Sequence, residues 1–496
     1  MTTAARGRPA NRFTRTVLRN SAFGVAAQVV IRLLSFAFSV LIVRALGVES
    51  YGQYAGVLAF GAMFVFIADL GVSPYTVREV AHWRDSADGL ARAGAIYGNI
   101  LPLRLLLSLL AAVLLVTSAW LTGRPAVMVG AIALGAVGLI IYSVQGASDA
   151  ILAGLERLDL SASARVLNQL AFVALGGAAL WLGAGYYGLI LANLAGITLM
   201  SLACWRCVGG LGIRPRRPVA LSWPALLRAS LPFGVIGFTL GLSYRFDSVL
   251  LSVFRGDAET GYYNAAYNLV FSTAALSNVL NTALYPSLVR QSATAPQTLP
   301  SIYGRALGYL TLLSLPIAVG TWALADQLVP FLFKAAYLPA VPALQIVIWV
   351  VPLMFISEFL GYVVVIRGKE NHVARAVVVS TGLNVALNLL LVPRYGFLCA
   401  AVMTVATEVV LVGQYVWMLR DLVRQLDWER ALLRPLAAAL LMGSLVFALR
   451  EQALLLSVPV GMLSYAGLLL GLGVVRKEEL RFVLSLRSSA LARSGR

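Results

Sequence analysis

The sequence has few charged residues for its length. Only 12% of its 496 residues are charged, whereas 60% are hydrophobic. A soluble protein of this size carries about twice that charged fraction, so the shortage excludes a soluble globular protein and predicts a multi-pass membrane protein. No cleavable signal peptide is expected, because the basic stretch MTTAARGRPANRFTRTVLRN leads directly into a full-length apolar run.

Cysteine and histidine are equally scarce. Cys204 and Cys207 have the C-x-x-C spacing of redox motifs, but the chain has only three cysteines and no second pair. His82 and His372 fall in predicted cytoplasmic loops. With no His/Cys cluster and no phosphate-cradling glycine motif, we expect no metal, no cofactor and no catalytic residue. A proton gradient, an ion gradient or the membrane potential remains open as an energy source.

Long apolar runs make up most of the chain and predict an all-α integral membrane protein. About fourteen transmembrane helices are expected, near residues 21–43, 54–77, 95–121, 125–152, 166–184, 186–205, 231–254, 262–288, 306–332, 342–366, 374–392, 397–419, 433–449 and 453–475.

The basic residues gather on one side of this predicted topology. Thirty of the 39 fall in the tails and the loops that share their side, six fall in the opposite loops, and Arg32, Arg104 and Arg245 fall inside spans. This is the positive-inside pattern, and it places both termini in the cytoplasm. The net charge of +18 therefore reflects topology and attraction to anionic lipid, and nucleic acid is not an expected partner.

Short motifs recur at a nearly constant spacing of 206 to 210 residues. FGV at 23–25 returns at 233–235, and the G-x-Y of Gly52 and Tyr54 returns at Gly261 and Tyr263. An even number of spans per copy predicts two parallel six-helix lobes, related by a pseudo-two-fold axis along the membrane normal. The predicted parts are a basic cytoplasmic tail (1–20), an N-lobe (21–210), a cytoplasmic linker (211–230), a C-lobe (231–420), two extra helices (421–475) and a second basic tail (476–496).

Two arginines lie deep in predicted spans, Arg32 in the first helix of one lobe and Arg245 in the first helix of the other. At the repeat spacing they differ by about one helical turn, so they share a helix face. A charge at the bilayer centre costs at least about 2.5–3.5 kcal/mol, so such residues normally face protein or water. A pair in the seam between the lobes suits an anionic ligand, above all phosphate.

The alternative is that carboxylates pair with these arginines and only fix helix packing. Asp247 is badly placed to serve Arg245, because positions two apart point to different sides of a helix. Asp69, Glu358 and Glu408 are other candidate partners. Glu408 is also a candidate proton or sodium site, and Arg104 is expected to snorkel to the cytoplasmic surface. Tyr244 is suited to stacking on sugars or to the interfacial aromatic belt.

Several motifs resemble those of bacterial oligosaccharide flippases of the polysaccharide-biosynthesis family, in the multidrug/oligosaccharidyl-lipid/polysaccharide exporter superfamily. In the first lobe the stretch VRALGVESYGQYAGVLAF and then FIADLGVSPYTVRE carries the pattern at Arg44, Leu46, Gly47, Tyr51, Gly52, Tyr54, Asp69, Leu70, Gly71 and Arg78. In the second lobe RFDSVLLSVFRGDAETGYYNAAYNL, ALYPSL and GLNVALNLLLVPRYGFLCAAVMTVATE are similar to the family's seventh, eighth and later spans. The resemblance covers residues 20 to 420, and many relatives have twelve spans rather than fourteen.

This resemblance implies that the protein moves a polyprenyl-pyrophosphate-linked oligosaccharide across the bacterial cytoplasmic membrane by alternating access. Membrane lipids and other polysaccharide-assembly proteins are further candidate partners. The expected substrate-binding residues are Arg32, Asp69, Arg78, Tyr244, Arg245 and Asp247, and the expected ion-coupling residues are Glu358 and Glu408.

Two other functions are alternatives. A multidrug antiporter of the same superfamily exports organic cations, for which two central arginines have the wrong charge. A lipid-linked glycosyltransferase, polymerase or ligase needs acid/base or metal-binding carboxylates, and the short outer loops hold few acidic residues.

Overall fold

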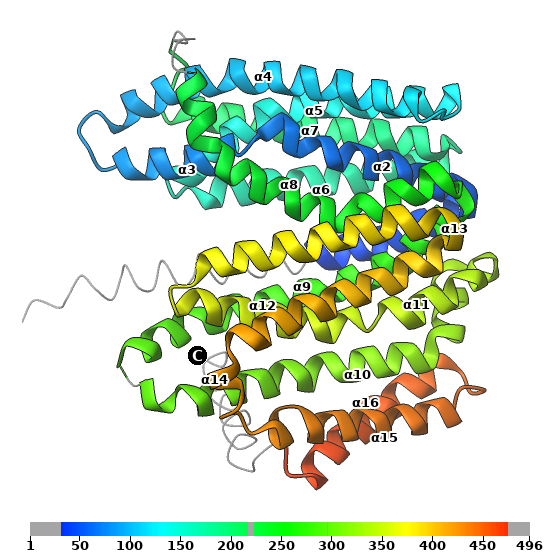
Figure 1. Ribbon diagram of the computed structural model, residues 1–496. Coiled ribbons are helices and arrows are strands. Elements are labelled where there is room, and N and C mark those ends of the chain that lie inside the picture. The colour runs from blue at the N-terminus through cyan, green and yellow to red at the C-terminus, as the bar shows by residue number, and fades with distance from the viewer. Residues whose placement is uncertain (1–30, 217–222, 295, 475–496) are drawn as a thin grey trace, which may run out of the picture. The chain divides into compact units, whose positions relative to one another are not determined.

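The computed structural model describes residues 31–216, 223–294 and 296–474, which are almost entirely helical (Figure 1). The predicted tails 1–20 and 476–496 and the start of the first predicted span lie outside these residues. The predicted all-α class is confirmed. By internal packing the chain divides into two units, Met1–Gly261 and Tyr262–Arg496, and each is described by itself.

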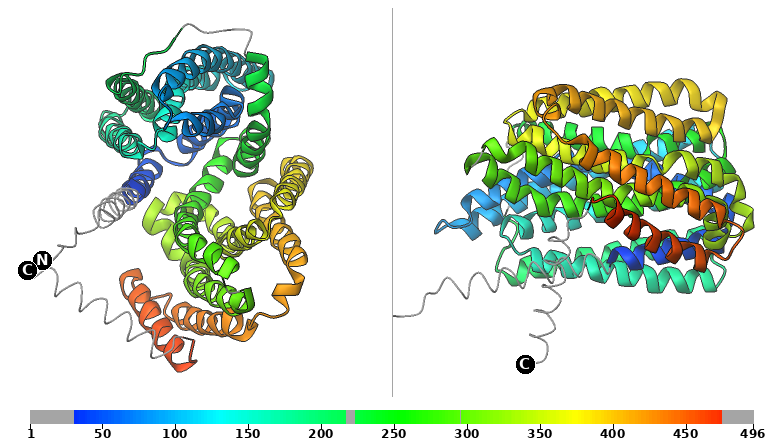
Figure 2. Two further views of the ribbon diagram at one scale, coloured as in Figure 1. Left: turned by 90° about the vertical axis from the view of Figure 1, so that its left-hand side faces the viewer. Right: turned by 90° about the horizontal axis from the view of Figure 1, so that it is seen from below.

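Unit 1 begins with a helix over residues 31–46. It continues with α2 (Val48–Asp69), α3 (Val72–Trp83), α4 (Gly89–Leu121), α5 (Ala126–Gly154), α6 (Leu158–Trp181), α7 (Gly185–Gly210) and α8 (Trp223–Phe254), and it ends with the first residues of α9 (Asp257–Thr294). Helix α2 contacts α4, α5 and α8. Figure 2 (left) looks nearly along the helix axes, and the long helices of this unit lie side by side.

The chain breaks between α2 and α3 at the D-L-G motif. Leu70 and Gly71 both have left-handed backbone angles, with φ of 43° and 77°. A methyl group on Gly71 would overlap the backbone of Ser230 and Gly234 in α8. Glycine is therefore required here for its conformation and for the close approach of α8. The turn ends α2 at Asp69, well before the predicted span end at residue 77.

Unit 2 contains the rest of α9 and a series of further helices: η2 (Pro296–Thr298), α10 (Leu299–Phe333), η3 (Ala335–Ala340), α11 (Val341–Val347), α12 (Val350–Ile366), α13 (Glu370–Met418), α14 (Arg420–Val423), η4 (Glu429–Leu433), α15 (Arg434–Ala448) and α16 (Leu454–Gly471). Helices α10, α15 and α16 share an apolar core that includes Val319, Met442 and Tyr465. The Tyr465 hydroxyl donates a hydrogen bond of 2.8 Å to the Leu312 carbonyl, which satisfies its only polar group in this core.

Helix α13 turns back on itself. Its 49 residues would extend about 73 Å as one straight helix, more than twice the hydrocarbon thickness of a bilayer. Gly396 interrupts it with φ 69° and ψ −156°, a combination that is essentially limited to glycine. In Figure 1 the halves before and after this point run side by side. The Asn384 amide joins them by donating to the Thr407 hydroxyl over 3.0 Å.

The predicted number of fourteen spans is not confirmed. Ten helices of the described part are long and apolar enough to cross a membrane, or eleven with α8, which bends by 47° between Thr239 and Gly241. The long helix α9 is too polar to count among them, and α13 counts once despite its break at Gly396. The first predicted span lies partly outside the described residues.

Many large apolar side chains point outward, as expected for helices surrounded by lipid. Trp181, Leu455 and Leu463 are 87%, 80% and 74% exposed. A soluble protein rarely exposes so much apolar surface. The structure therefore agrees with the composition that this is a multi-pass membrane protein.

Candidate functional site

Helices α2 and α8 pack closely because α8 presents glycines three and four residues apart. A methyl group on Gly234 would lie 2.7 Å from the Leu70 carbonyl carbon, and the Phe66 ring fills the space beside Gly241. Small residues at this spacing let membrane helices approach closely. Gly56 of α2 lies against the Ser252 side chain, so the two helices run antiparallel.

Arg245 lies on the side of α8 that faces α2. It is four residues after Gly241 and seven before Ser252, and both of these positions contact α2. The Arg245 side chain is half-buried. Within the described ranges its guanidinium group forms no hydrogen bond or ion pair. A ligand role for Arg245 stays a prediction.

Arg32 has a different environment. It is the second described residue of the helix over 31–46, and its side chain is exposed. It also has no hydrogen-bond or ion-pair partner among the residues that the structure describes. The repeat predicts similar positions for Arg32 and Arg245, but the Arg32 side chain is exposed whereas that of Arg245 is half-buried. A ligand role for Arg32 stays a prediction.

Asp69 and Arg104 form a buried ion pair. Nη1 of Arg104 lies 2.6 Å from Oδ1 of Asp69, and the arginine is fully buried. The Ser73 hydroxyl donates to Asp69 over 2.6 Å and accepts a hydrogen bond from Arg104. Gly146 of α5 leaves the space that the guanidinium group occupies. The prediction that Arg104 snorkels is therefore wrong, because Asp69 neutralises it inside the bundle.

This pairing gives the D-L-G motif a structural role. Asp69 ends α2 and, through Ser73, holds the first turn of α3. Removing one partner of a buried ion pair is strongly destabilising, because it leaves the other charge uncompensated. A substrate-binding role for Asp69 stays a prediction, and the ion pair must be separated from it by experiment.

Three further predicted site residues lie on α3 and α8. Arg78 has an exposed side chain, 3.2 Å from Glu79, and its guanidinium carbon lies 5.6 Å from the Phe233 ring centre. Tyr244 is 40% exposed, and Asp247 is only 3% exposed. Since α8 contacts both α2 and α3, the structure brings five of the six predicted substrate-binding residues onto one packed group of helices.

Sequence reasoning missed a contact at the opposite end of α2. Arg124, between α4 and α5, donates to the Ser252 carbonyl and pairs with Asp257, at 2.7 Å. Beside it the start of α2 packs closely on the start of α9, since a methyl group on Gly52 would overlap the Asp257 carbonyl and one on Gly261 would overlap the Val48 carbonyl. The available signal was the repeat, which matched Gly52 with Gly261.

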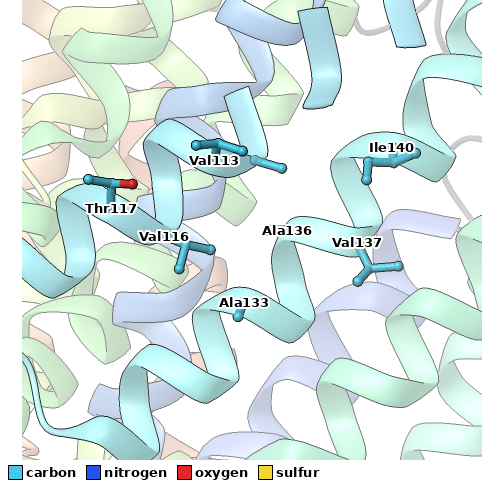
Figure 3. A pocket seen from close by; sticks show the side chains of 8 residues that line it. Val113, Val116, Thr117, Ala133, Ala136, Val137 and Ile140 are labelled. Carbon is cyan, nitrogen blue, oxygen red and sulfur yellow. The ribbon is translucent and has the colours of Figure 1, made fainter. Parts of the chain in front are cut away.

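Two hollows in the described part of unit 1 are mainly apolar. One, of about 380 Å³, lies between α4 and α5 (Figure 3) and is lined by Ala112, Val113, Val116, Thr117, Ala133, Ala136, Val137 and Ile140. A second, of about 190 Å³, is lined mainly by α2, α5 and α7, with Tyr54, Tyr142 and Asn193 as its polar residues. Neither is lined by an arginine. The first suits a hydrocarbon chain better than a phosphate.

Unit 2 holds the two predicted ion-coupling residues. Glu358 of α12 accepts hydrogen bonds from Ser277 over 2.7 Å and from Asn281 over 3.3 Å, both of α9. Glu408 of α13 accepts one from Ser357, the neighbour of Glu358. Both carboxylates are half-buried. Among the described residues no group of three His, Cys, Asp or Glu side chains is arranged to hold a metal.

Comparisons with known proteins identify relatives of this chain. The chain is 22% identical over 368 residues to the "Probable low-salt glycan biosynthesis flippase Agl15" of Haloferax volcanii, which covers 72% of this chain and 76% of that protein. Among solved structures, the fold is similar to a lipid II flippase MurJ in an inward closed conformation, with a TM-score of 0.76 and 13% identity over 90% of this chain and 98% of that one.

A multidrug resistance MATE family transporter in an inward-facing conformation is also similar, with a TM-score of 0.60 and 16% identity over 80% of this chain and 95% of that one. At these identities the two structures establish the fold alone. A family profile described as "Polysaccharide biosynthesis protein" matches residues 17–292, more than half of the chain. The protein therefore belongs to the polysaccharide biosynthesis protein family.

Proposed function

We propose that this protein is a flippase that moves a polyprenyl-pyrophosphate-linked oligosaccharide from the cytoplasmic to the outer leaflet. The observation that carries the proposal is Arg245, a half-buried guanidinium group without a described partner on the α2-facing side of α8. Pyrophosphate offers the oxygens that its fork of donors can bind. Family membership and the flippase names of the relatives support the same function.

The charge pattern supports an orientation of the protein in the membrane. The excess of basic residues in the tails and the loops on their side puts both termini in the cytoplasm of a cell whose cytoplasmic membrane holds the protein. The Leu70 end of α2 then faces the cytoplasm and the Gly52 end faces outside. At the outer end Arg124 pairs with Asp257, and the backbone at Gly52 packs closely against Asp257.

The rival functions have less support. A MATE-type antiporter for organic cations shares the fold, but an unpaired arginine repels a cation that enters beside α8. The enzyme alternative loses ground because the named relatives are flippases and transporters. For this chain we therefore favour an anionic, lipid-linked substrate over both a cationic drug and a sugar-transfer reaction.

The test is a flipping assay with the purified full chain in proteoliposomes that contain a lipid-linked oligosaccharide. We expect the substrate that starts in the inner leaflet to become accessible to a membrane-impermeant glycosidase outside several-fold faster than in vesicles without protein. A parallel assay measures efflux of a cationic dye. Dye efflux without movement of the lipid-linked sugar contradicts the proposal and favours the antiporter.

A further inference from the structure

Glu358 and Glu408 place two carboxylates together inside unit 2, with no basic side chain among the described residues to balance them. They lie close enough for the charge of one to act on the other. Neither forms an ion pair with a basic side chain in the described part of the chain. Two negative charges side by side in a membrane-spanning region are costly.

The groups that surround the carboxylates are neutral. Ser277 donates to Oε2 of Glu358, and Asn281 donates to the same oxygen and to the Ser277 hydroxyl over 3.1 Å. The Ser357 hydroxyl likewise donates a hydrogen bond to Glu408. These donors stabilise negative charge through dipoles only, so they do not replace a cation.

Asn281, beside Glu358, has a side-chain oxygen that accepts no hydrogen bond from a described residue. Its side chain is 1% exposed, and its Oδ1 atom has no hydrogen-bond partner. A buried acceptor without a partner costs about 1–3 kcal/mol. If the amide turns over by 180°, the oxygen takes the place of the nitrogen that faces Glu358. There it accepts a hydrogen bond from Glu358 only when that carboxyl carries a proton.

The other titratable side chains around the pair are tyrosines. Tyr415 of α13 interacts electrostatically with Glu408. Tyr285 of α9 packs against Tyr362 of α12, with ring centres 5.0 Å apart and ring planes tilted by 45°. Tyr303 of α10 packs on Phe359, and the charge of Arg367, at the end of α12, acts on that tyrosine. Since tyrosines are neutral near pH 7, they leave the charge of the two glutamates unbalanced.

We propose that Glu358 and Glu408 bind one proton between them, with Asn281 as the residue that adjusts its amide to the protonated state. Binding of the proton converts one carboxylate to a carboxylic acid and changes the net charge of the pair from −2 to −1. Each residue is therefore a proton-binding site whose affinity depends on the other. That the proton also drives transport rests on the proposed function, whereas proton binding itself does not.

The test is an infrared titration of the purified full chain in lipid nanodiscs, without any glycan or sodium. The C=O stretch of a protonated carboxylic acid is followed against pH. We expect a titrating band that is lost in the double variant Glu358→Gln/Glu408→Gln. In either single variant the midpoint falls by about one pH unit or more, because the remaining carboxylate has lost its like-charged neighbour. Glu370→Gln, at the exposed start of α13, is the matched control and leaves band and midpoint unchanged.

Three results would overturn the inference. One is an acid band in the native protein that persists in the double variant. Another is a midpoint that stays the same in both single variants, which means that the glutamates do not share the proton. The third is the absence of a titrating carboxylic-acid band in the native protein, which means that the pair binds no proton. Proton binding without flipping in the proteoliposome assay contradicts the proposed function and leaves this inference standing.

Discussion

Arg124 is joined to Asp257 by an ion pair of 2.7 Å that links the turn between α4 and α5 to the first turn of α9. The arginine is only 8% exposed, and it also donates to the Ser252 carbonyl at the end of α8. A partly buried pair of this kind is stronger than an exposed one, since solvent screens it less. It fixes the end of α8 that the charge pattern places outside.

Breaking this pair is expected to open the outer end. In a background with the three native cysteines replaced by serine, Ser248→Cys reports access to the α8 face toward α2. We expect Arg124→Gln to raise its labelling by an impermeant thiol reagent from outside by several-fold. The exposed pair of Arg255 and Glu259 nearby provides the control, since Arg255→Gln should leave labelling unchanged. Equal labelling in both variants would show that Arg124 does not hold this end closed.

The ion pair of Asp69 and Arg104 is expected to carry stability. Asp69→Ala should lower the free energy of unfolding by about 3–5 kcal/mol, because it leaves Arg104 buried and unpaired. Replacing both residues with apolar ones, as in Asp69→Leu/Arg104→Met, should recover most of this loss. Thermal unfolding in detergent measures both variants. If Asp69→Ala keeps the native stability and loses transport, the residue acts as a ligand instead.

The glycine face of α8 is expected to tolerate no side chain opposite Phe66. Gly241→Leu should cost about 1–3 kcal/mol of stability by overpacking, and Phe66→Ala in the same chain should restore part of it. Gly177→Ala in α6 is the matched control, because a methyl group there meets no atom within 4 Å. An equal loss in Gly241→Leu with and without Phe66→Ala would mean that the two helices do not pack through these residues.

The turn at Gly396 makes a separate prediction. Its backbone angles are strained for any residue with a Cβ atom, so Gly396→Ala should destabilise the protein by about 1–3 kcal/mol. Gly382→Ala, in the first half of α13 and free of close contacts, should be neutral or slightly stabilising. Denaturation in detergent distinguishes them. Equal stability of the two variants would argue against a reversal of the chain at Gly396.

Much of the fold follows from the sequence because lipid leaves the chain little choice. An apolar segment long enough to cross the bilayer forms a helix, because its backbone polar groups must bond to each other in lipid. For this reason the sequence predicts the all-α class and most helix positions correctly. The number of spans was less accessible. It depends on how the polar helix α9 is accommodated, whereas the break at Gly396 falls between the predicted spans 374–392 and 397–419.

The site was predictable only in part. Arg245 stands out as a charge within an apolar run, and that signal is local. The partner of Arg104 has no such local signal, because Asp69 lies 35 positions earlier and contacts Arg104 only after α2, α3 and α4 have packed. The same holds for Arg124 and Asp257, which are 133 positions apart. Spacing along one helix predicts which residues share a face and gives no information about partners on another.

The most direct test of the account is the rate at which Arg245 variants flip a lipid-linked oligosaccharide in proteoliposomes. We expect Arg245→Ala to reduce the rate at least about tenfold, and Arg245→Lys to keep part of it as a charge without the fork geometry. Arg255→Ala, ten residues along the same chain and exposed at the end of α8, should flip at the native rate. An Arg245→Ala protein that folds and flips as fast as the native chain would contradict the account.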